Sequence, residues 1–217
     1  MEMSGLTSLR YLRHLERAVN VGGERAVHAC LKRYQRPLWV AFAHGWNAIM
    51  VVPEFRFGRR YRADFLVLSS HSAALHATMV ELESSTARLY TKAGAESKAL
   101  TVALRQVKDW HAWVSDFPDQ FRREVADEID RAATEDRRVS RLGRDVLRAE
   151  LLDHRTALLS HFAIVIGRRH SLSPEDAQRR GGESRWRTGL EITTYDRLLE
   201  IGQGDDQGRA EHRKMIR

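Results

Sequence analysis

The chain has 217 residues, a net charge of +7 and 42% hydrophobic residues. This composition is that of an ordinary globular protein and excludes wholesale disorder. The longest strongly apolar runs, 48–52 and 162–166, have five residues each, whereas a membrane span needs about 20. We therefore expect no membrane or secretory segment, and the single cysteine, Cys30, excludes an intramolecular disulfide and favours a cytoplasmic protein.

The N-terminal residues predict two helices. Leu6, Leu9, Leu12 and Leu15 recur about once per helical turn, and Gly22-Gly23 then interrupts the pattern. A second helix is expected over 24–34, with Glu24 in its first turn, where the helix dipole favours a carboxylate.

Residues 37–83 are rich in Val, Phe, Trp, Tyr and Leu and predict strands. Four strands are expected, at 38–43, 48–57, 61–68 and 76–83, with turns at 44–45, 58 and 69–72. Short links of this kind imply an antiparallel meander.

The second half begins with a helical pattern over 95–113, and Pro118 ends that helix or starts the next one. A densely charged helical region follows over 121–153. Strands are then expected at 162–166 and 186–193, a helix between them with Ser173 as cap and Pro174 as its first residue, and a helical turn at 195–201.

This order of elements predicts a mixed α/β (α+β) fold. We expect an N-terminal helix at 1–23, one domain over 24–201 with a helical insertion at 115–155, and a flexible tail at 202–217.

Three acids carry the chemical signal. Asp64 lies inside a strand-like run, where a buried and unpaired acid is costly. Glu81 and Glu83 flank Leu82, so both carboxylates emerge on one face of a strand. If this strand lies beside the one that bears Asp64, three carboxylates converge, and such a patch suits Mg²⁺ or Mn²⁺ and phosphodiester hydrolysis. The alternative is a solvated face of an edge strand, with Asp64 paired to Arg56 or Arg62.

Gln106 lies four residues before Trp110, on the same face of the predicted 95–113 helix. It could reach a phosphate, a water molecule or a base from the helix that packs on the sheet. It could also be an ordinary surface amide.

Several short motifs, in this order, resemble the nuclease domain of the Shedu anti-phage defence proteins, which has a PD-(D/E)XK nuclease core. They are Glu24 on an early helix, the segment 58–65 (GRRYRADF), the segment 80–83 (VELE), the helix 103–110 (ALRQVKDW), 166–168 (IGR) and 194–199 (TYDRLL). The resemblance covers about residues 24–201 and implies a restriction-endonuclease-like fold, in which helices flank a mixed sheet.

The resemblance further implies a metal-dependent endonuclease that acts on DNA in bacterial anti-phage defence and assembles as a homo-oligomer. Asp64 and Glu81 would bind Mg²⁺ or Mn²⁺, and Glu24 would help directly or through water. Gln106 would orient the phosphate or the attacking water. A catalytically inactive module that keeps the fold and only binds nucleic acid is the alternative.

One position departs from the family pattern, because Glu83 stands where a lysine is usual. Lysine would offset negative charge in the transition state, whereas glutamate can act only as a general base or a metal ligand. Lys92 could supply the missing charge or be a surface residue.

Arginines offer contacts to DNA phosphates. Candidate nucleic-acid-binding residues, with Lys92, are Arg56, Arg59, Arg60, Arg62, Arg168 and Arg169. Each of these could instead balance a nearby acid. The histidines show no HExxH pair, and His28, His44 and His111 are expected to be structural or surface residues.

Overall fold

The computed structural model describes residues 11–71, 74–135, 141–186 and 189–201. Helical residues 11–17 lead into the π-helix η1 (Ala18–Gly22), and 195–201 are also helical. The named elements that follow are α2 (Gly23–Arg33), α3 (Arg36–Phe42), β1 (Ala48–Phe57), β2 (Tyr61–His71), β3 (Ala74–Leu82), α4 (Lys98–Asp116), α5 (Pro118–Glu135), α6 (Arg141–Leu152), β4 (Ala157–Val165), the 3₁₀ turn η2 (Arg169–Ser171), α7 (Pro174–Trp186) and β5 (Leu190–Thr193).

Within the described residues, five strands form one mixed sheet in the order β1-β2-β3-β4-β5. The pairs β1–β2 and β2–β3 are antiparallel, whereas β3–β4 and β4–β5 are parallel. The parallel step from β3 to β4 requires a crossover, which α4, α5 and α6 provide. The carboxyl ends of β3, β4 and β5 therefore meet at one edge of the sheet.

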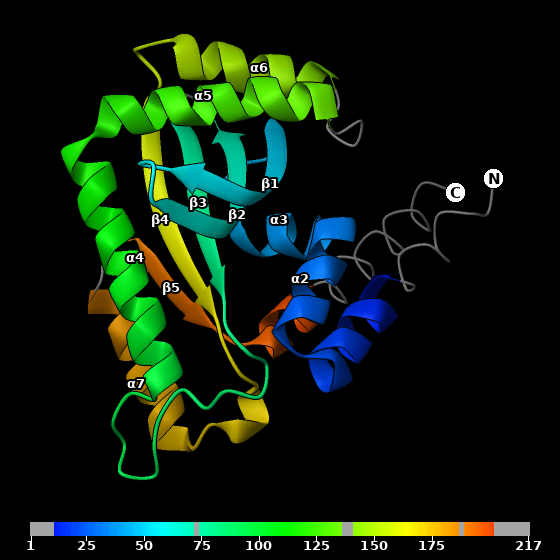
Figure 1. The fold of residues 1–217 in the computed structure, drawn as a ribbon, viewed down its shortest axis with the longest axis vertical. Coiled ribbons are helices and arrows are strands. Elements are labelled where there is room, and N and C mark those ends of the chain that lie inside the picture. Colours follow the sequence, from blue (N-terminus) through cyan, green and yellow to red (C-terminus); the bar gives the residue numbers. More distant parts are fainter. Residues whose placement is uncertain (1–10, 72–73, 136–140, 187–188, 202–217) are drawn as a thin grey trace, which may run out of the picture.

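Helices cover both faces of the sheet (Figure 1). On one face the strands pack against α4, α5 and α6 around Trp110, Phe121 and Phe57. On the other face they pack against α2, α3 and the helical segments at both ends of the described chain, around Leu31, Leu38 and Tyr195. A sheet covered on both faces explains why residues 65–70 of β2 are all buried, including Ser69 and Ser70.

The structure confirms the mixed α/β class and most predicted elements, and it corrects one of them. Residues 38–43 are not a strand, because Arg36–Phe42 form the helix α3. Pro37 lies in its first turn, where proline is favoured, and Leu38 and Phe42, four residues apart, are buried on one side. The antiparallel meander therefore has three strands, β1, β2 and β3.

The predicted boundaries differ elsewhere by a few residues. Residues 69–71 belong to β2, and Ser69 and Ser70 are buried there. The predicted turn at 69–72 is therefore wrong for residues 69–71. Trp186 ends α7 and does not start β5. Residues 6–10, 72 and the predicted tail at 202–217 lie outside the described residues.

The predicted helical insertion, 115–155, contains α5 and α6, which lie across one end of the molecule (Figure 1). Their apolar sides complete the core on one face of the sheet through Phe121, Val125, Ile129, Leu147 and Leu151. None of the helices in the described part of the chain combines the length and apolar character that a bilayer span requires.

Candidate active site

The candidate active site lies where β2 and β3 separate. Their backbone ladder ends at the pair Phe65–Val80, one position before Asp64 and Glu81 would face each other. Beyond this point the side chain of Asp64 replaces the backbone, because its Oδ2 accepts a hydrogen bond of 2.8 Å from the backbone N–H of Leu82. The two predicted acidic strands are therefore neighbours, and their carboxylates lie at the same fork.

The alternation of side chains along β1 and β2 changes phase at this fork. On β2, Ala63 and Leu66 both pack on the α4 side, whereas Phe65 packs on the α2 side. On β1 the change occurs at Glu54, whose φ is 55°, a left-handed value that is uncommon for residues other than glycine. Asp64 lies at the position where the phase changes on β2, so its carboxylate lies at the end of the ladder.

Glu81 contacts α4 through its side chain. It belongs to β3, and Gln106 of α4 donates a hydrogen bond to its carboxylate. Burial, together with the charges of Asp64 and Glu83, raises the pKa of Glu81 to about 9. Gln106 therefore lies at the acid cluster, and its predicted contact with a phosphate, a water molecule or a base stays a prediction.

Glu83 lies just past the end of β3 and is partly buried. Its backbone N–H donates to the carbonyl of Val165 on β4, which continues the parallel pairing. Burial and the charges of Glu24 and Asp64 raise the pKa of Glu83 to about 7. The pKa of Asp64 is raised as well, first by burial, against the hydrogen bond from Leu82.

Helix α2 brings two further groups to the cluster. Glu24 lies in its first turn, and its negative charge raises the pKa of Asp64, Glu81 and Glu83. His28, one turn later, places its Nε2 4.0 Å from Oδ1 of Asp64, and both side chains are 22% exposed. Four carboxylates therefore act on one another here, and the neighbouring His28 and Arg62 act in the opposite direction by lowering the pKa of Asp64.

Tyr195 contacts the backbone of the acid cluster. It is fully buried, and its hydroxyl donates a hydrogen bond of 2.7 Å to the backbone carbonyl of Glu83. Burial and the charges of Asp64, Glu24, Glu83 and Glu81 raise the pKa of this hydroxyl well above its ordinary value. Tyr195 stays protonated and fixes the backbone on which Glu83 is carried.

A hollow of about 420 Å³ lies on the α4 side of the fork. Its lining includes Gln106 and three arginines, Arg60, Arg62 and Arg105. Arg62 also acts electrostatically on Asp64, so the hollow and the acid cluster adjoin each other. A basic hollow beside a group of carboxylates suits an anionic polymer whose backbone must reach the acids.

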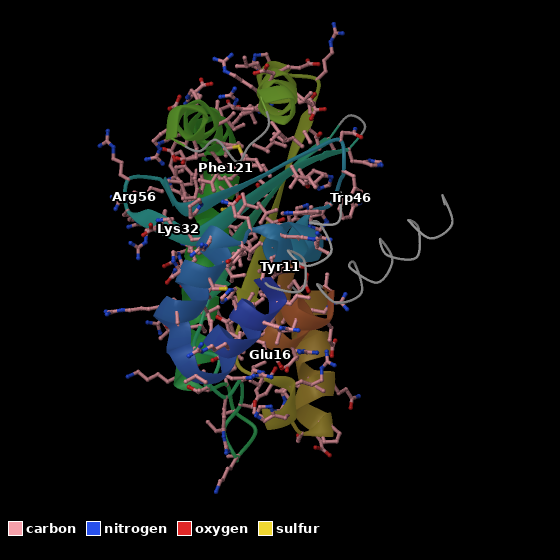
Figure 2. The ribbon with its side chains drawn as sticks, turned by 90° about the vertical axis from the view of Figure 1, so that its right-hand side faces the viewer. Tyr11, Glu16, Lys32, Trp46, Arg56 and Phe121 are labelled. Atoms are coloured by element: carbon pink, nitrogen blue, oxygen red, sulfur yellow. The ribbon has the colours of Figure 1, made fainter. Side chains whose placement is uncertain are left out.

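The remaining predicted basic residues are dispersed. Arg56 and Arg59 are exposed near the β1–β2 hairpin, and Figure 2 shows Arg56 at the edge of the molecule. Arg168 binds Asp196, and Arg169 binds Glu200. Their guanidinium groups thus already pair with acids of this chain.

Lys92 does not lie with the acid cluster. It lines a separate hollow of about 490 Å³ with loop residues before α4 and the first turns of α7. The charges that act on Glu83 are those of Glu24 and Asp64. Lys92 is not among the charges that act on Glu83, so its part in replacing the missing lysine stays a prediction.

Comparison of the sequence with known protein families gives a match that covers most of the chain. Residues 23–199 match the family described as Shedu protein SduA, C-terminal. The chain belongs to this family. Membership suggests a role in anti-phage defence. A search of curated proteins found no match.

The donor set of this Shedu-family site fits a hard divalent cation. Mg²⁺ is usually held by one or two carboxylates and completes its shell with water and phosphate oxygens. Asp64 and Glu81 supply two such groups from adjacent strands. Among the described residues, the oxygens of three carboxylates do not gather within 4.8 Å of one another. Glu24 and Glu83 both act electrostatically on Glu81.

Sequence reasoning missed three residues of the site. His28 is four residues after Glu24 on α2, so the helical spacing alone could have placed both on one face. Arg105 precedes Gln106 and lines the same hollow. Tyr195 lies in the motif 194–199 that carried the family resemblance, but its contact with Glu83 joins residues 112 positions apart and had no local signal.

Proposed function

We propose that the chain is a metal-dependent endonuclease that hydrolyses phosphodiester bonds of DNA in bacterial anti-phage defence, and that it acts as a homo-oligomer. The observation that carries the proposal is the convergence of Asp64, Glu81 and Glu83 at the fork between β2 and β3, with Gln106 bound to Glu81. The basic hollow beside this fork supports DNA as the substrate.

Asp64 and Glu81 would hold Mg²⁺ or Mn²⁺. When bound, such an ion supplies Lewis acidity toward a phosphate oxygen. It would also relieve the mutual repulsion of the carboxylates, which burial makes costly in the metal-free protein.

Glu83 would accept the proton of the attacking water. Its pKa of about 7 suits a general base at neutral pH. Tyr195 fixes the carbonyl of Glu83 and so limits the positions that the carboxylate can reach. Gln106, held on the rigid α4, would keep Glu81 oriented, and Arg60, Arg62 and Arg105 would bind the phosphates on either side.

The substitution Asp64→Asn tests this proposal, because the side-chain oxygen can still accept the hydrogen bond from Leu82 while the charge is lost. We expect single-turnover cleavage of supercoiled and linear DNA in Mg²⁺ to fall by about 10³-fold or more, since losing several kcal/mol of charge stabilisation costs about tenfold per 1.4 kcal/mol. Measured DNA affinity should be unchanged or tighter.

Glu191→Gln is the matched control. Glu191 is a glutamate on β5, two strands away from β3 in the sheet. Burial also raises its pKa, but the charges that act on it are those of Arg197 and Arg180. It should cut DNA at the wild-type rate. Cleavage by Asp64→Asn as fast as by this control would refute the proposed site.

A second candidate function follows from one observation. The charged groups that act on Glu83, at the usual lysine position, are both acids. A site in which no cation acts on the residue at this position could bind DNA without cutting it. In that case the wild-type chain would bind DNA at the basic hollow and show no metal-dependent cleavage.

A further inference from the structure

A second cluster of ionisable side chains lies at the other end of β3, away from the acids. His76 of β3 and His161 of β4 lie on adjacent parallel strands, and His44 lies in the loop that follows α3. One ring nitrogen from each of the three lies within 4.8 Å of the others. Within the part of the chain that the structure describes, this is the one trio of potential metal ligands this close together.

We propose that His44, His76 and His161 form a binding site for a transition-metal ion, with Zn²⁺ as the best-suited ion. Imidazole nitrogens suit Zn²⁺, Ni²⁺ and Cu²⁺, whereas Mg²⁺ prefers oxygen. Zinc held tetrahedrally at 2.0–2.1 Å would place its ligand nitrogens about 3.4 Å apart. The trio is therefore near the required spacing.

The rings are arranged as a compact group. Nδ1 of His76 lies 2.9 Å from Nε2 of His161, so without a metal one ring donates to the other. The ring of His44 stacks on that of His161 with centroids 4.0 Å apart and planes at 20°. Three rings in such contact cannot all be positively charged, and burial together with the repulsion from His44 and His76 lowers the pKa of His161 to about 4. Neutral imidazole is the form that binds metals.

The loop that carries His44 is held firmly against the sheet. The backbone N–H of His44 donates to Oγ of Ser69, and the hydroxyl of Thr78 donates to the carbonyl of Phe42. Directly after His44, Gly45 passes so close to β2 that a Cβ there would be 2.2 Å from the carbonyl oxygen of Ser70. These contacts order the loop that carries His44 before any metal arrives, which lowers the entropy cost of binding.

One side of the trio opens to solvent. His44 is exposed, whereas His76 and His161 are partly buried. Trp46, which Figure 2 labels, marks this loop at the surface. A metal ion here would have three protein ligands and an open fourth position for water or an external group. It would also tie the loop after α3 to β3 and β4.

This site is separate from the acid cluster. His76 precedes Glu81 by five positions on β3, which is about 17 Å along an extended strand. The two sites also differ in donor type, with nitrogen at one end and oxygen at the other. Zinc binding can therefore be tested independently of DNA cleavage.

The experiment is a Zn²⁺ titration of the metal-free full chain without a polyhistidine tag, read by calorimetry and by competition with a chromophoric chelator. We expect the wild type to bind one Zn²⁺ per chain, and His161→Gln and His76→Gln to bind it about 100-fold or more weakly, because even outer contacts of metal ligands are worth 10–100-fold. His154→Gln, at an exposed histidine elsewhere, should bind as the wild type does.

Two further variants keep the test decisive. His44→Gln changes only the exposed loop ligand, so its loss of Zn²⁺ affinity counts even if the two strand variants fail to fold. Glu81→Ala should retain Zn²⁺ binding, whatever its effect on cleavage. Binding that persists in His44→Gln, or that disappears in Glu81→Ala, would overturn the site.

Discussion

The two ends of strand β3 carry opposite kinds of ionisable group. At its carboxyl end Glu81 and Glu83 meet Asp64 and Glu24, and at its amino end His76 meets His161 and His44. At both ends, burial and neighbouring groups of the same charge type disfavour the charged form of the side chain. The pKa of Glu81 therefore rises to about 9, and that of His161 falls to about 4.

The difference lies in what each end can bind. Neutral imidazoles already present free electron pairs, so the histidine end is prepared for a transition metal. The acid end is repulsive when ionised and is relieved only by a cation or a proton. One strand thus separates a nitrogen site from an oxygen site, and each of the following variants should affect one end without the other.

The largest expected effect concerns DNA, which we place at the acid end alone. Replacing Arg60, Arg62 and Arg105 with glutamine removes three cations from the hollow, and we expect DNA affinity to fall by about 100-fold. The slope of log affinity against log salt should flatten by about 0.9 for each phosphate that the protein no longer neutralises. Fluorescence anisotropy over a salt series measures both quantities.

His76→Gln is the matched comparison for this measurement and should bind DNA as the wild type does. Equal reductions in affinity in the triple variant and in His76→Gln would remove the distinction between the two ends. An unchanged salt slope in the triple variant would place the DNA elsewhere.

The next variant acts at the histidine end. Gly45→Ala forces a methyl group against the carbonyl of Ser70, so we expect the free energy of unfolding to fall by about 1–3 kcal/mol. Zn²⁺ affinity should fall too, because the loop that carries His44 must move. Asn47→Ala, at an exposed side chain in the same loop, is the control. Chemical denaturation would contradict this account of the loop if Gly45→Ala unfolded at the same midpoint as the control.

A third variant tests the repulsion at the acid end through the pH dependence of stability. The folded protein holds the proton of Glu81 more tightly than the unfolded chain does, because its pKa rises from 4.5 to about 9. The free energy of unfolding of the metal-free protein should therefore decline as pH rises from about 4.5 to about 9.

Glu81→Gln cannot ionise and should escape this decline. We expect it to be more stable than the wild type by about 1–2 kcal/mol at pH 8, allowing for partial exposure, with no gain near pH 4.5. Added Mg²⁺ should narrow the gap by stabilising the wild type. Parallel stability curves for the two proteins across this pH range would show that Glu81 is not under strain.

The smallest expected effect belongs to Tyr195→Phe. It removes the hydrogen bond to the carbonyl of Glu83 and should cost about 1 kcal/mol of unfolding free energy. If this bond positions Glu83, cleavage should slow while DNA affinity stays constant. Tyr34→Phe, at a half-buried tyrosine directly after α2 and outside the basic hollow, gives the comparison for loss of a tyrosine hydroxyl elsewhere. Equal cleavage rates in the two variants would limit Tyr195 to a packing role.

Much of the fold could be predicted from the sequence, because long periodic segments carry their own signal. The spacing of Leu100, Leu104 and Val107 predicted α4, and Ser173 with Pro174 predicted the start of α7, where Asp176 N–H donates to the Ser173 hydroxyl. The predicted strand at 38–43 was wrong because a short apolar run is compatible with a strand or with a buried helix. Pro37 was the local signal that favoured the helix.

The acid cluster was partly predictable for a similar reason. Alternation along β3 placed Glu81 and Glu83 together, and helical spacing gave Gln106 a face toward the sheet. The phase change at Glu54 and Asp64 had no signature in the residue pattern. The pairing of strands that brings His76 to His161, 85 positions apart, could come only from the tertiary structure.

The most direct measurement is metal-dependent cleavage of supercoiled, nicked and linear DNA, with Mg²⁺ or Mn²⁺, by the wild type, Glu81→Ala and Glu83→Lys. We predict that the wild type cuts, that Glu81→Ala does not, and that chelation of the metal abolishes cutting. A wild type that is inert with both ions, beside a Glu83→Lys variant that cuts, would contradict a working nuclease and leave a DNA-binding module that has lost its lysine.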